Sequence, residues 1–421
     1  MKTIGRICLL FFLLSCCGKC WAEPSYQGKT LSAWLDDYGA GPGDYKPSPQ
    51  ADEALRQIGP EAVPYLLQLL HSTNSADTNS PAPVPASWNH WKAYLAFQAL
   101  GPLGKAAIPD LVKLAHDPSD QSNPSGTGMA PGVRFWKDTK MVAKFADESA
   151  TYLAPGQLPF RGTVSLIRAI LVDGEIAAWS LAAIGADSVS PLMELLADPN
   201  PRLRCRAAVA LGLIGGAAEP AVPALIKMLD DPDINTRWEA TDALGCIGKR
   251  PDIVVPALIG ALADPNIGMK FDAMESLGDF REQATNAIPA LLAFFPERDM
   301  RLGQTAASAL IKISRDTTEK EVLPFLLHRI KDSSYVYARS EAVGTLGQMK
   351  DEPDLAIPPL IEALGDTNTM NAAIQRLGEF GPAAKAAVPK LVPLTTNQDS
   401  RVRDQAVTAL GKIDSAWQSG H

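Results

Sequence analysis

The sequence has little cysteine, and most of it lies near the start of the chain. Four of the six cysteines fall within the first 20 residues, so the rest of the chain contains only Cys205 and Cys246. Two thiols cannot build a structural zinc site or a disulfide framework. Their positions in neighbouring repeats also place them about 12 Å apart along the helix axis, beyond disulfide reach. We therefore expect two unreactive thiols and no metal site.

Catalytic signatures are also missing. The five histidines are scattered without metal-ligand spacing, and neither a nucleophile elbow nor a phosphate-binding glycine loop is present. Asp231, Asp233 and Asn235 imitate the start of a calcium loop. However, Thr236 stands where that loop needs glycine, and Asp242 stands where it needs glutamate. The sequence therefore predicts a protein that is not an enzyme and has no cofactor.

Basic charge is scarce. The chain carries 39 Lys and Arg against 47 Asp and Glu, a net charge of −8. Residues 1–22 hold three basic and no acidic side chains, so without them 36 basic residues face 47 acidic ones, a net charge of −11. Such a surface repels a phosphate backbone, and no basic stripe with interleaved aromatics compensates for it. Nucleic acid is therefore not an expected partner.

Long hydrophobic runs are absent, because the apolar run from Ile7 to Leu14 is far shorter than the roughly 20 residues of a membrane span. Basic residues precede this run and a polar stretch follows it, which is typical of an export signal. We interpret residues 1–22 as a signal peptide with two alternative fates. Cleavage after Ala22 would release the chain to the periplasm or the exterior, whereas lipidation of Cys16 would produce a membrane-anchored lipoprotein.

What the sequence contains instead is a repeated helical pattern. The pattern has three positions: an alanine, a leucine four residues later, and a large apolar residue three residues after the leucine. This spacing puts all three side chains on one face of a helix, and the small alanine lets a neighbouring helix approach closely. The pattern occurs ten times, at Ala51/Leu55/Ile58, Ala96/Leu100/Leu103, Ala177/Leu181/Ile184, Ala207/Leu211/Ile214, Ala240/Leu244/Ile247, Ala273/Leu277/Phe280, Ala306/Leu310/Ile313, Ala342/Leu346/Met349, Ala373/Leu377/Phe380 and Ala406/Leu410/Ile413.

A second helix, opened by proline, follows each of the first nine. Proline is tolerated in a first helical turn because the N–H that it lacks would have no partner there. A helical hairpin of this kind must stack on its neighbours to bury both faces. The nine prolines are Pro64, Pro109, Pro191, Pro223, Pro256, Pro289, Pro324, Pro358 and Pro389.

The repeats share further residues, shown by Asp231-Pro232-Asp233, Arg237, the run from Ala243 to Gly248, and Val255-Pro256-Ala257-Leu258. This motif resembles the short bacterial HEAT repeat, the subtype named after phycobilisome lyases, over residues 50–115 and 174–414. The resemblance implies an all-α, right-handed α-solenoid of about ten stacked hairpins, with the repeated Asp and Arg as turn caps and bonds between repeats.

Four positions depart from the family pattern. Lys270, Gly303 and Met370 replace the repeated arginine, and Ser314 stands where a turn glycine is usual. We expect the stack to be less regular at these positions.

The chain is organised around this array. Residues 23–50 form an N-terminal cap helix and loop, in which Thr30 caps a helix with an apolar stripe. Residues 51–116 hold two repeats with a loop insert at 71–91. Residues 117–173 form a second insert, either a mobile loop alone or a loop with one degenerate hairpin. Residues 174–421 form the regular array.

Two aromatic residues are the candidate binding residues. Cys205, Trp238 and Phe271 occupy the same position in three successive first helices, opposite the alanine stripe, so Trp238 and Phe271 should lie side by side on the outer face. Either they pack against a neighbouring element or they contact a partner. We expect the inner face to come from second helices.

The expected inner face includes three second-helix residues, Lys227, His328 and Glu362. Because their charges are mixed, this face suits a protein partner better than a polyanion. The sequence therefore predicts an exported scaffold that binds another protein. One alternative is a phycobilin-lyase-like enzyme or chaperone that handles a tetrapyrrole, which an export signal disfavours. Another is a structural subunit of a cell-envelope assembly.

Overall fold

The computed structural model describes residues 23–39, 48–71, 86–116, 173–295, 300–331, 336–414 and 417. The predicted signal peptide with Cys16, and most of the second predicted insert, lie outside these residues. The chain divides into two compact units, with the border between Pro191 and Leu192. This border falls inside the predicted regular array rather than at its start, because a sequence period does not report how densely successive repeats contact one another.

In the described residues of the first unit, the helices are accompanied by one short hairpin of two antiparallel strands. Its elements are β1 (Ser25–Tyr26), β2 (Lys29–Thr30), α2 (Leu31–Asp36), α3 (Pro49–Ile58), η2 (Gly59–Ala62), α4 (Val63–Leu70), α5 (Ala86–Leu100), η3 (Gly101–Ala107), α6 (Ile108–Ala115), α10 (Asp173–Ile184) and η4 (Ala186–Ser188), followed at the border by α11 (Val189–Leu195).

The predicted cap helix is α2. The hydroxyl of Thr30 accepts a hydrogen bond from the backbone N–H of Ala33, which satisfies one free donor at the helix start. Leu31 and Leu35 are buried. The Tyr38 hydroxyl donates to the Asp52 carboxylate at 2.5 Å, which ties the end of the cap to α3.

The first insert is shorter than predicted. The sequence indicated a loop over residues 71–91, but α5 already begins at Ala86. Aromatic packing supports this early start, because the ring centroid of Trp91 lies 5.2 Å from that of Tyr94, which lies 5.8 Å from that of Trp179. The proline-rich composition concealed this helix start.

The second unit continues the same hairpin plan. Its elements are α12 (Pro201–Ile214), η5 (Gly215–Ala221), α13 (Val222–Met228), α14 (Ile234–Ile247), α15 (Pro251–Ala261), α16 (Ile267–Asp279), η6 (Arg281–Ala287), α17 (Ile288–Leu292), α18 (Met300–Ile313), α19 (Arg315–Thr317), the π-helix η7 (Thr318–Val322), α20 (Leu323–Lys331), α21 (Val336–Leu346), α22 (Pro353–Ala363), α23 (Met370–Phe380), η8 (Gly381–Ala387), α24 (Val388–Leu391), η9 (Val392–Thr396) and α25 (Ser400–Ile413).

The alanine and leucine stripe forms the core, as predicted. All ten repeated alanines are fully buried, and each of the ten leucines is at most 2% exposed. Glycines in the same helices permit similarly close contacts. A Cβ added to Gly278 would lie 3.1 Å from the Cα of Ala309, and one added to Gly378 would lie 3.0 Å from the Cα of Ala409. Successive first helices therefore touch almost backbone to backbone.

Two of the nine predicted helix starts are wrong. Seven of the prolines lie in the first turn of a second helix, but Pro256 and Pro358 lie inside α15 and α22. These two helices begin earlier, at Pro251 and Pro353, where proline followed directly by aspartate suits a helix N-terminus. In several other repeats the corresponding residues form a 3-10 turn, such as η5 and η8.

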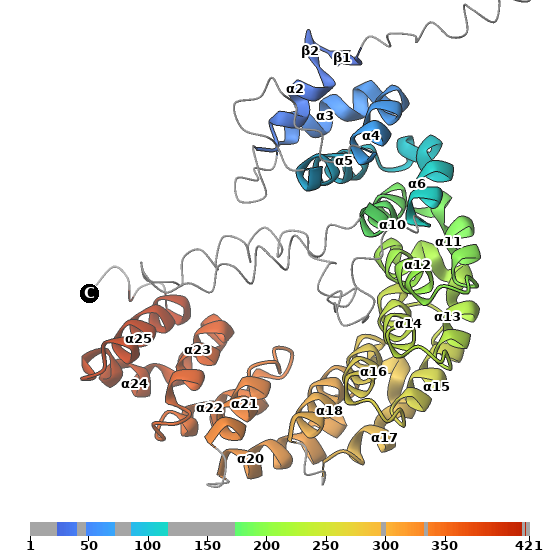
Figure 1. Cartoon of the computed structure of the whole chain (residues 1–421). Coiled ribbons are helices and arrows are strands. Elements are labelled where there is room, and N and C mark those ends of the chain that lie inside the picture. The colour runs from blue at the N-terminus through green and yellow to red at the C-terminus, as the bar shows by residue number, and fades with distance from the viewer. Residues whose placement is uncertain are drawn as a thin grey trace, which may run out of the picture. The chain divides into compact units, whose positions relative to one another are not determined.

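The inner and outer rows of helices are the reverse of those predicted, because the prediction put second helices on the inner face. Within the second unit, the first helices α12, α14, α16 and α18 lie on the inside of the curve, and the second helices α13, α15 and α17 lie on its outside (Figure 1). Lys227 on α13 therefore does not belong to the inner face, and His328 and Glu362 also lie on second helices. The curvature arises from small rotations between stacked hairpins, which the sequence pattern does not reveal.

One stretch of the described chain, Pro201–Met228, is long and apolar enough to cross a membrane by length and composition. It comprises α12, η5 and α13, and Gly215 at a φ of +70° ends the first of these helices. Leu211 and Leu225, from the two helices, are both fully buried. The long apolar stretch therefore consists of two helices that form the buried core of a hairpin.

Enlarging a core alanine should destabilise the second unit. Ala240 is fully buried against the neighbouring helices, so Ala240→Leu should lower the free energy of unfolding by about 1–3 kcal/mol through overpacking. The matched control is Ala217→Leu on the exposed side of η5, which should change it by about 0.5 kcal/mol or less. Urea unfolding followed by circular dichroism measures both. Equal losses would contradict a packing role for the alanine.

Candidate functional site

The structure places the two predicted aromatic residues at equivalent positions in α14 and α16, both half-buried. These two helices belong to the inner row (Figure 1), so the predicted position on the outer face is wrong. The ring of Trp238 packs over Gly268 at the start of α16, where an added Cβ would lie 3.5 Å from the ring. The guanidinium of Arg301, at the start of α18, lies 5.6 Å from the centroid of the Phe271 ring. Each aromatic side chain thus contacts the first turn of the next repeat. This geometry matches edge packing, and binding of a partner by these two residues stays a prediction.

Cys205 makes the same kind of contact one repeat earlier. Its Sγ lies 3.4 Å from the Thr236 hydroxyl, in the first turn of α14. Burial raises the pKa of the Cys205 thiol to about 12, so the thiol is protonated near neutral pH. Within the described part of the chain, Cys205 and Cys246 are the free cysteines, as predicted.

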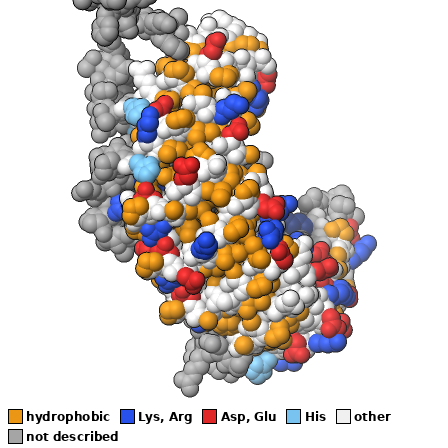
Figure 2. Space-filling view, turned by 90° about the vertical axis from the view of Figure 1, so that its right-hand side faces the viewer, with side chains coloured by type: hydrophobic (Ala, Val, Ile, Leu, Met, Phe, Trp, Pro, Cys, Tyr) orange, Lys and Arg blue, Asp and Glu red, His pale blue; other side chains and the backbone are white. Residues whose placement is uncertain are grey.

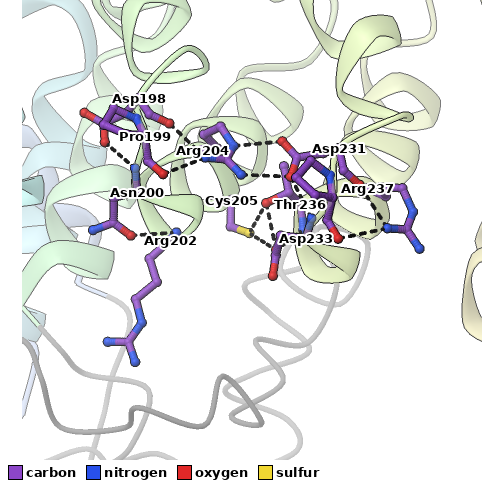
Figure 3. A network of polar contacts seen from close by, with 11 residues as sticks. Asp198, Pro199, Asn200, Arg202, Arg204, Cys205, Asp231, Asp233, Thr236 and Arg237 are labelled. Carbon is purple, nitrogen blue, oxygen red and sulfur yellow. Dashed lines mark hydrogen bonds and ion pairs between the residues drawn. The ribbon is translucent and has the colours of Figure 1, made fainter.

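The repeated arginine and aspartate link successive repeats (Figure 3). Nε and Nη2 of Arg204 each lie 2.8 Å from a carboxylate oxygen of Asp231 in the next repeat, while Nη1 donates to the backbone carbonyl of Asp198. Arg237 repeats the arrangement with Asp264 at 2.9 Å. Both pairs are largely buried. We call each pair a rung.

The acidic residues that imitate a calcium loop take part in rungs and helix caps instead. Asp231 pairs with Arg204, and the carboxylate of Asp233 accepts hydrogen bonds from the backbone N–H and the hydroxyl of Thr236. Among the described residues, no group of three or more His, Cys, Asp or Glu side chains is arranged to hold a metal ion. The recurrence of these acids therefore reflects helix capping and inter-repeat bonding.

Two of the four departures from the family pattern have a physical explanation. A side chain at Gly303 would crowd the Phe325 ring, because an added Cβ would lie 3.1 Å from it. The Phe325 ring stacks on Phe295 at 4.1 Å between centroids, and Arg329 lies 5.0 Å above it. Lys270 similarly lies 5.8 Å from the Phe294 ring centroid. An aromatic and cationic cluster thus replaces the rung around α18.

The rung returns after this cluster, since Arg339 pairs with Asp366. Arg403, in the last helix, donates to the backbone carbonyls of Asn397 at 2.8 Å and Gln398 at 2.9 Å. The expected irregularity is therefore local, and the stack continues through it.

A groove of about 470 Å³ lies along three successive first helices, α18, α21 and α23. We call it the first-helix groove. Amide and hydroxyl side chains dominate its lining, together with one aromatic side chain, that of Tyr337, which is 83% exposed. Residues that line it include Gln304, Ser308, Tyr337, Gln348, Gln375 and Arg376. Sequence reasoning missed this site.

The groove forms where the packing of the first helices changes. Gln304 occupies the register position of Trp238 and Phe271, and its amide donates to the backbone carbonyl of Glu341 at 2.7 Å and to the Thr345 hydroxyl. A polar contact between α18 and α21 thus replaces the aromatic contacts of earlier repeats. These two helices also contact each other less extensively than α16 and α18 do.

Arg376 closes the groove on the side of α23. It stands at a register position that Ala243, Ala309 and Ala409 occupy in other repeats. A Cβ added to Gly347 would lie 2.2 Å from the Arg376 side chain, so this glycine lets the arginine lie across α21. An arginine in an otherwise small-residue position is the sequence signal that could have indicated the groove.

The groove carries little net charge. Among its lining residues Arg376 is basic and Glu341 acidic, and the others are neutral. Arg376 Nη1 also lies 2.8 Å from the carboxylate of Glu379, on its own helix. On the outer side of the second unit, the view toward α13 and α15 shows charged side chains of both signs scattered among apolar ones (Figure 2). The groove is thus a mainly neutral, hydrogen-bonding surface.

Comparison with protein families confirms the predicted repeat type. The HEAT repeats model matches residues 175–245, 222–311 and 357–418, and the PBS lyase HEAT-like repeat model matches residues 338–366. No curated protein matches the sequence.

Solved structures of Kap121p are among those that match the chain. Kap121p alone is 15% identical over 88% of this chain and 47% of its own, with a TM-score of 0.44. Kap121p bound to Ste12p is 14% identical over 87% and 48%, with a TM-score of 0.45. The chain spans about half the length of these structures.

Removing one side of a rung should destabilise the second unit. Arg204→Ala leaves the largely buried Asp231 carboxylate without its cation and should cost about 3 kcal/mol of unfolding free energy. The double variant with Asp231→Ala should cost less than the sum of the single variants, because the two residues interact directly. Urea unfolding of the four proteins measures this coupling.

The control for the rung is the exposed pair Arg250 and Asp252, with side chains 44% and 61% exposed. Arg250→Ala should leave the unfolding midpoint nearly unchanged, since solvent screens such a pair. A shift as large as that of Arg204→Ala would contradict the importance of burial for the rung.

Proposed function

We propose that this chain of HEAT repeats is an exported, non-catalytic scaffold that binds another protein through the first-helix groove. The observation that carries the proposal is the groove itself, which runs over three successive first helices and exposes Tyr337. Its volume of about 470 Å³ falls within the range of about 300–1,000 Å³ that is usual for ligand sites.

The chemistry of the groove supports a protein partner. Exposed aromatic side chains contribute strongly to protein interfaces, and amide and hydroxyl groups supply the hydrogen bonds of an interface rim. The acidic balance of the chain disfavours a nucleic-acid partner. Repeat stacks commonly use such extended surfaces for binding.

Export is the second part of the proposal, and it rests on the leader in residues 1–22. Export is supported by a short apolar run that follows basic residues and precedes a polar stretch. The chain then acts in the periplasm, outside the cell, or at a membrane through a lipid on Cys16. A permanent subunit of an envelope assembly would differ from a transient scaffold in the lifetime of its complex.

Partner capture should depend on Tyr337. Crosslinking in intact cells, followed by identification of the crosslinked proteins, should give a defined partner whose yield falls at least fivefold with Tyr337→Ala, because the variant removes an exposed aromatic contact. Val407→Ala, which truncates a 49% exposed side chain on α25, should leave the yield unchanged. Equal yields from both variants would place the partner elsewhere.

Processing of the leader should be visible in the mass of the purified chain. A chain that begins at Glu23 would show cleavage after Ala22, and a lipid-modified chain that begins at Cys16 would show the lipoprotein route. Intact-mass spectrometry of protein from the cell envelope distinguishes the two. A chain that keeps residues 1–22 and stays in the cytoplasm would contradict export.

A further inference from the structure

We propose that the first-helix groove binds an extended, uncharged peptide segment of the partner through the main chain of that segment. The inference rests on the proposed function and adds the kind of surface that the partner presents. Its basis is the arrangement of side-chain amides and hydroxyls over α18, α21 and α23, three helices that follow one another in the second unit (Figure 1).

The hydrogen-bonding groups of the groove match those of a peptide main chain. Gln348, just after α21, and Gln375 on α23 are exposed. The Gln348 amide has two donors and an acceptor, whereas Gln375 donates one amide hydrogen to Glu379 at 3.1 Å and keeps the other hydrogen and its oxygen. The hydroxyls of Ser308 and Ser340 can also donate and accept. An extended peptide presents alternating N–H and C=O groups, so it can pair with such side chains whatever its own side chains are.

The spacing of the helices fits a short extended segment. Neighbouring packed helices lie about 8–10 Å apart, so three of them span about 16–20 Å. An extended chain rises by about 3.3 Å per residue, so about five or six residues cover this distance. One segment of that length can therefore contact Gln304 on α18, Gln348 just after α21, and Gln375 on α23.

The charge of the groove selects against strongly charged segments. The lining has one acidic residue, Glu341, and one basic residue, Arg376, which already pairs with Glu379. A run of lysines or glutamates would therefore lose water without gaining a matching set of countercharges. Tyr337 instead offers a ring face for an apolar side chain of the peptide. The occupant is thus a segment with an apolar residue and no net charge.

The test uses the full chain and a labelled hexapeptide, acetyl-Ser-Gln-Leu-Thr-Gln-Ser-amide, followed by fluorescence anisotropy. This peptide should bind with a measurable Kd below about 1 mM. Versions in which two residues are replaced by Lys, or two by Glu, should bind at least tenfold more weakly. A version with methylated backbone nitrogens should also lose at least tenfold, because it lacks main-chain donors.

Protein variants locate the binding. Gln348→Ala together with Gln375→Ala should weaken binding of the uncharged peptide at least tenfold, since two main-chain hydrogen bonds are lost. Gln398→Ala changes an exposed glutamine outside the groove and should leave the Kd unchanged. Circular dichroism of each variant verifies that the helical fold is retained.

Three results would overturn the inference: no binding of the uncharged peptide up to about 1 mM, stronger binding of a charged version, or equal binding of the methylated version. If crosslinking to the native partner still depends on Tyr337 in that case, the partner docks as a folded surface and the proposed function stands. If the dependence on Tyr337 is also absent, both proposals fail.

Discussion

The close approach of successive first helices is the contact on which the rest of the structure depends. Every repeat presents an alanine at the same register position, and all of these alanines are fully buried. A larger side chain would separate the helices and weaken every contact that follows from their spacing. The rungs and the edge contacts of Trp238 and Phe271 join the same successive repeats, whose first helices also approach closely at Gly278 and Ala309.

Successive repeats are joined by two different kinds of side-chain contact. In the first repeats of the second unit a buried arginine pairs with an aspartate of the following repeat, whereas around α18 stacked phenylalanines beneath cations take this place. Both solutions join the start of one first helix to a neighbouring turn. Because a side chain at Gly303 would crowd the Phe325 ring, the departure from the repeat pattern and the cluster are one feature.

The residues with functional promise are those that vary between repeats. Asp231, Arg237 and the alanines recur, and the structure uses them for capping, rungs and packing. Trp238 and Phe271 vary, yet each packs on the next repeat. The groove was not predicted because its lining comes from three helices whose starts are more than 30 residues apart in sequence. Arg376, which stands where other repeats carry alanine, was the available sign.

The sequence by itself determined the helical hairpins, their buried alanine and leucine faces, the cap helix and the HEAT type of repeat, because these features depend on periodicity and on residues close together in the chain. Tertiary structure decided which row of helices lines the inside of the second unit, where α15 and α22 begin, and where the groove lies. Those features result from side-chain contacts between repeats, and small rotations at each contact add up in a way that a local pattern does not encode.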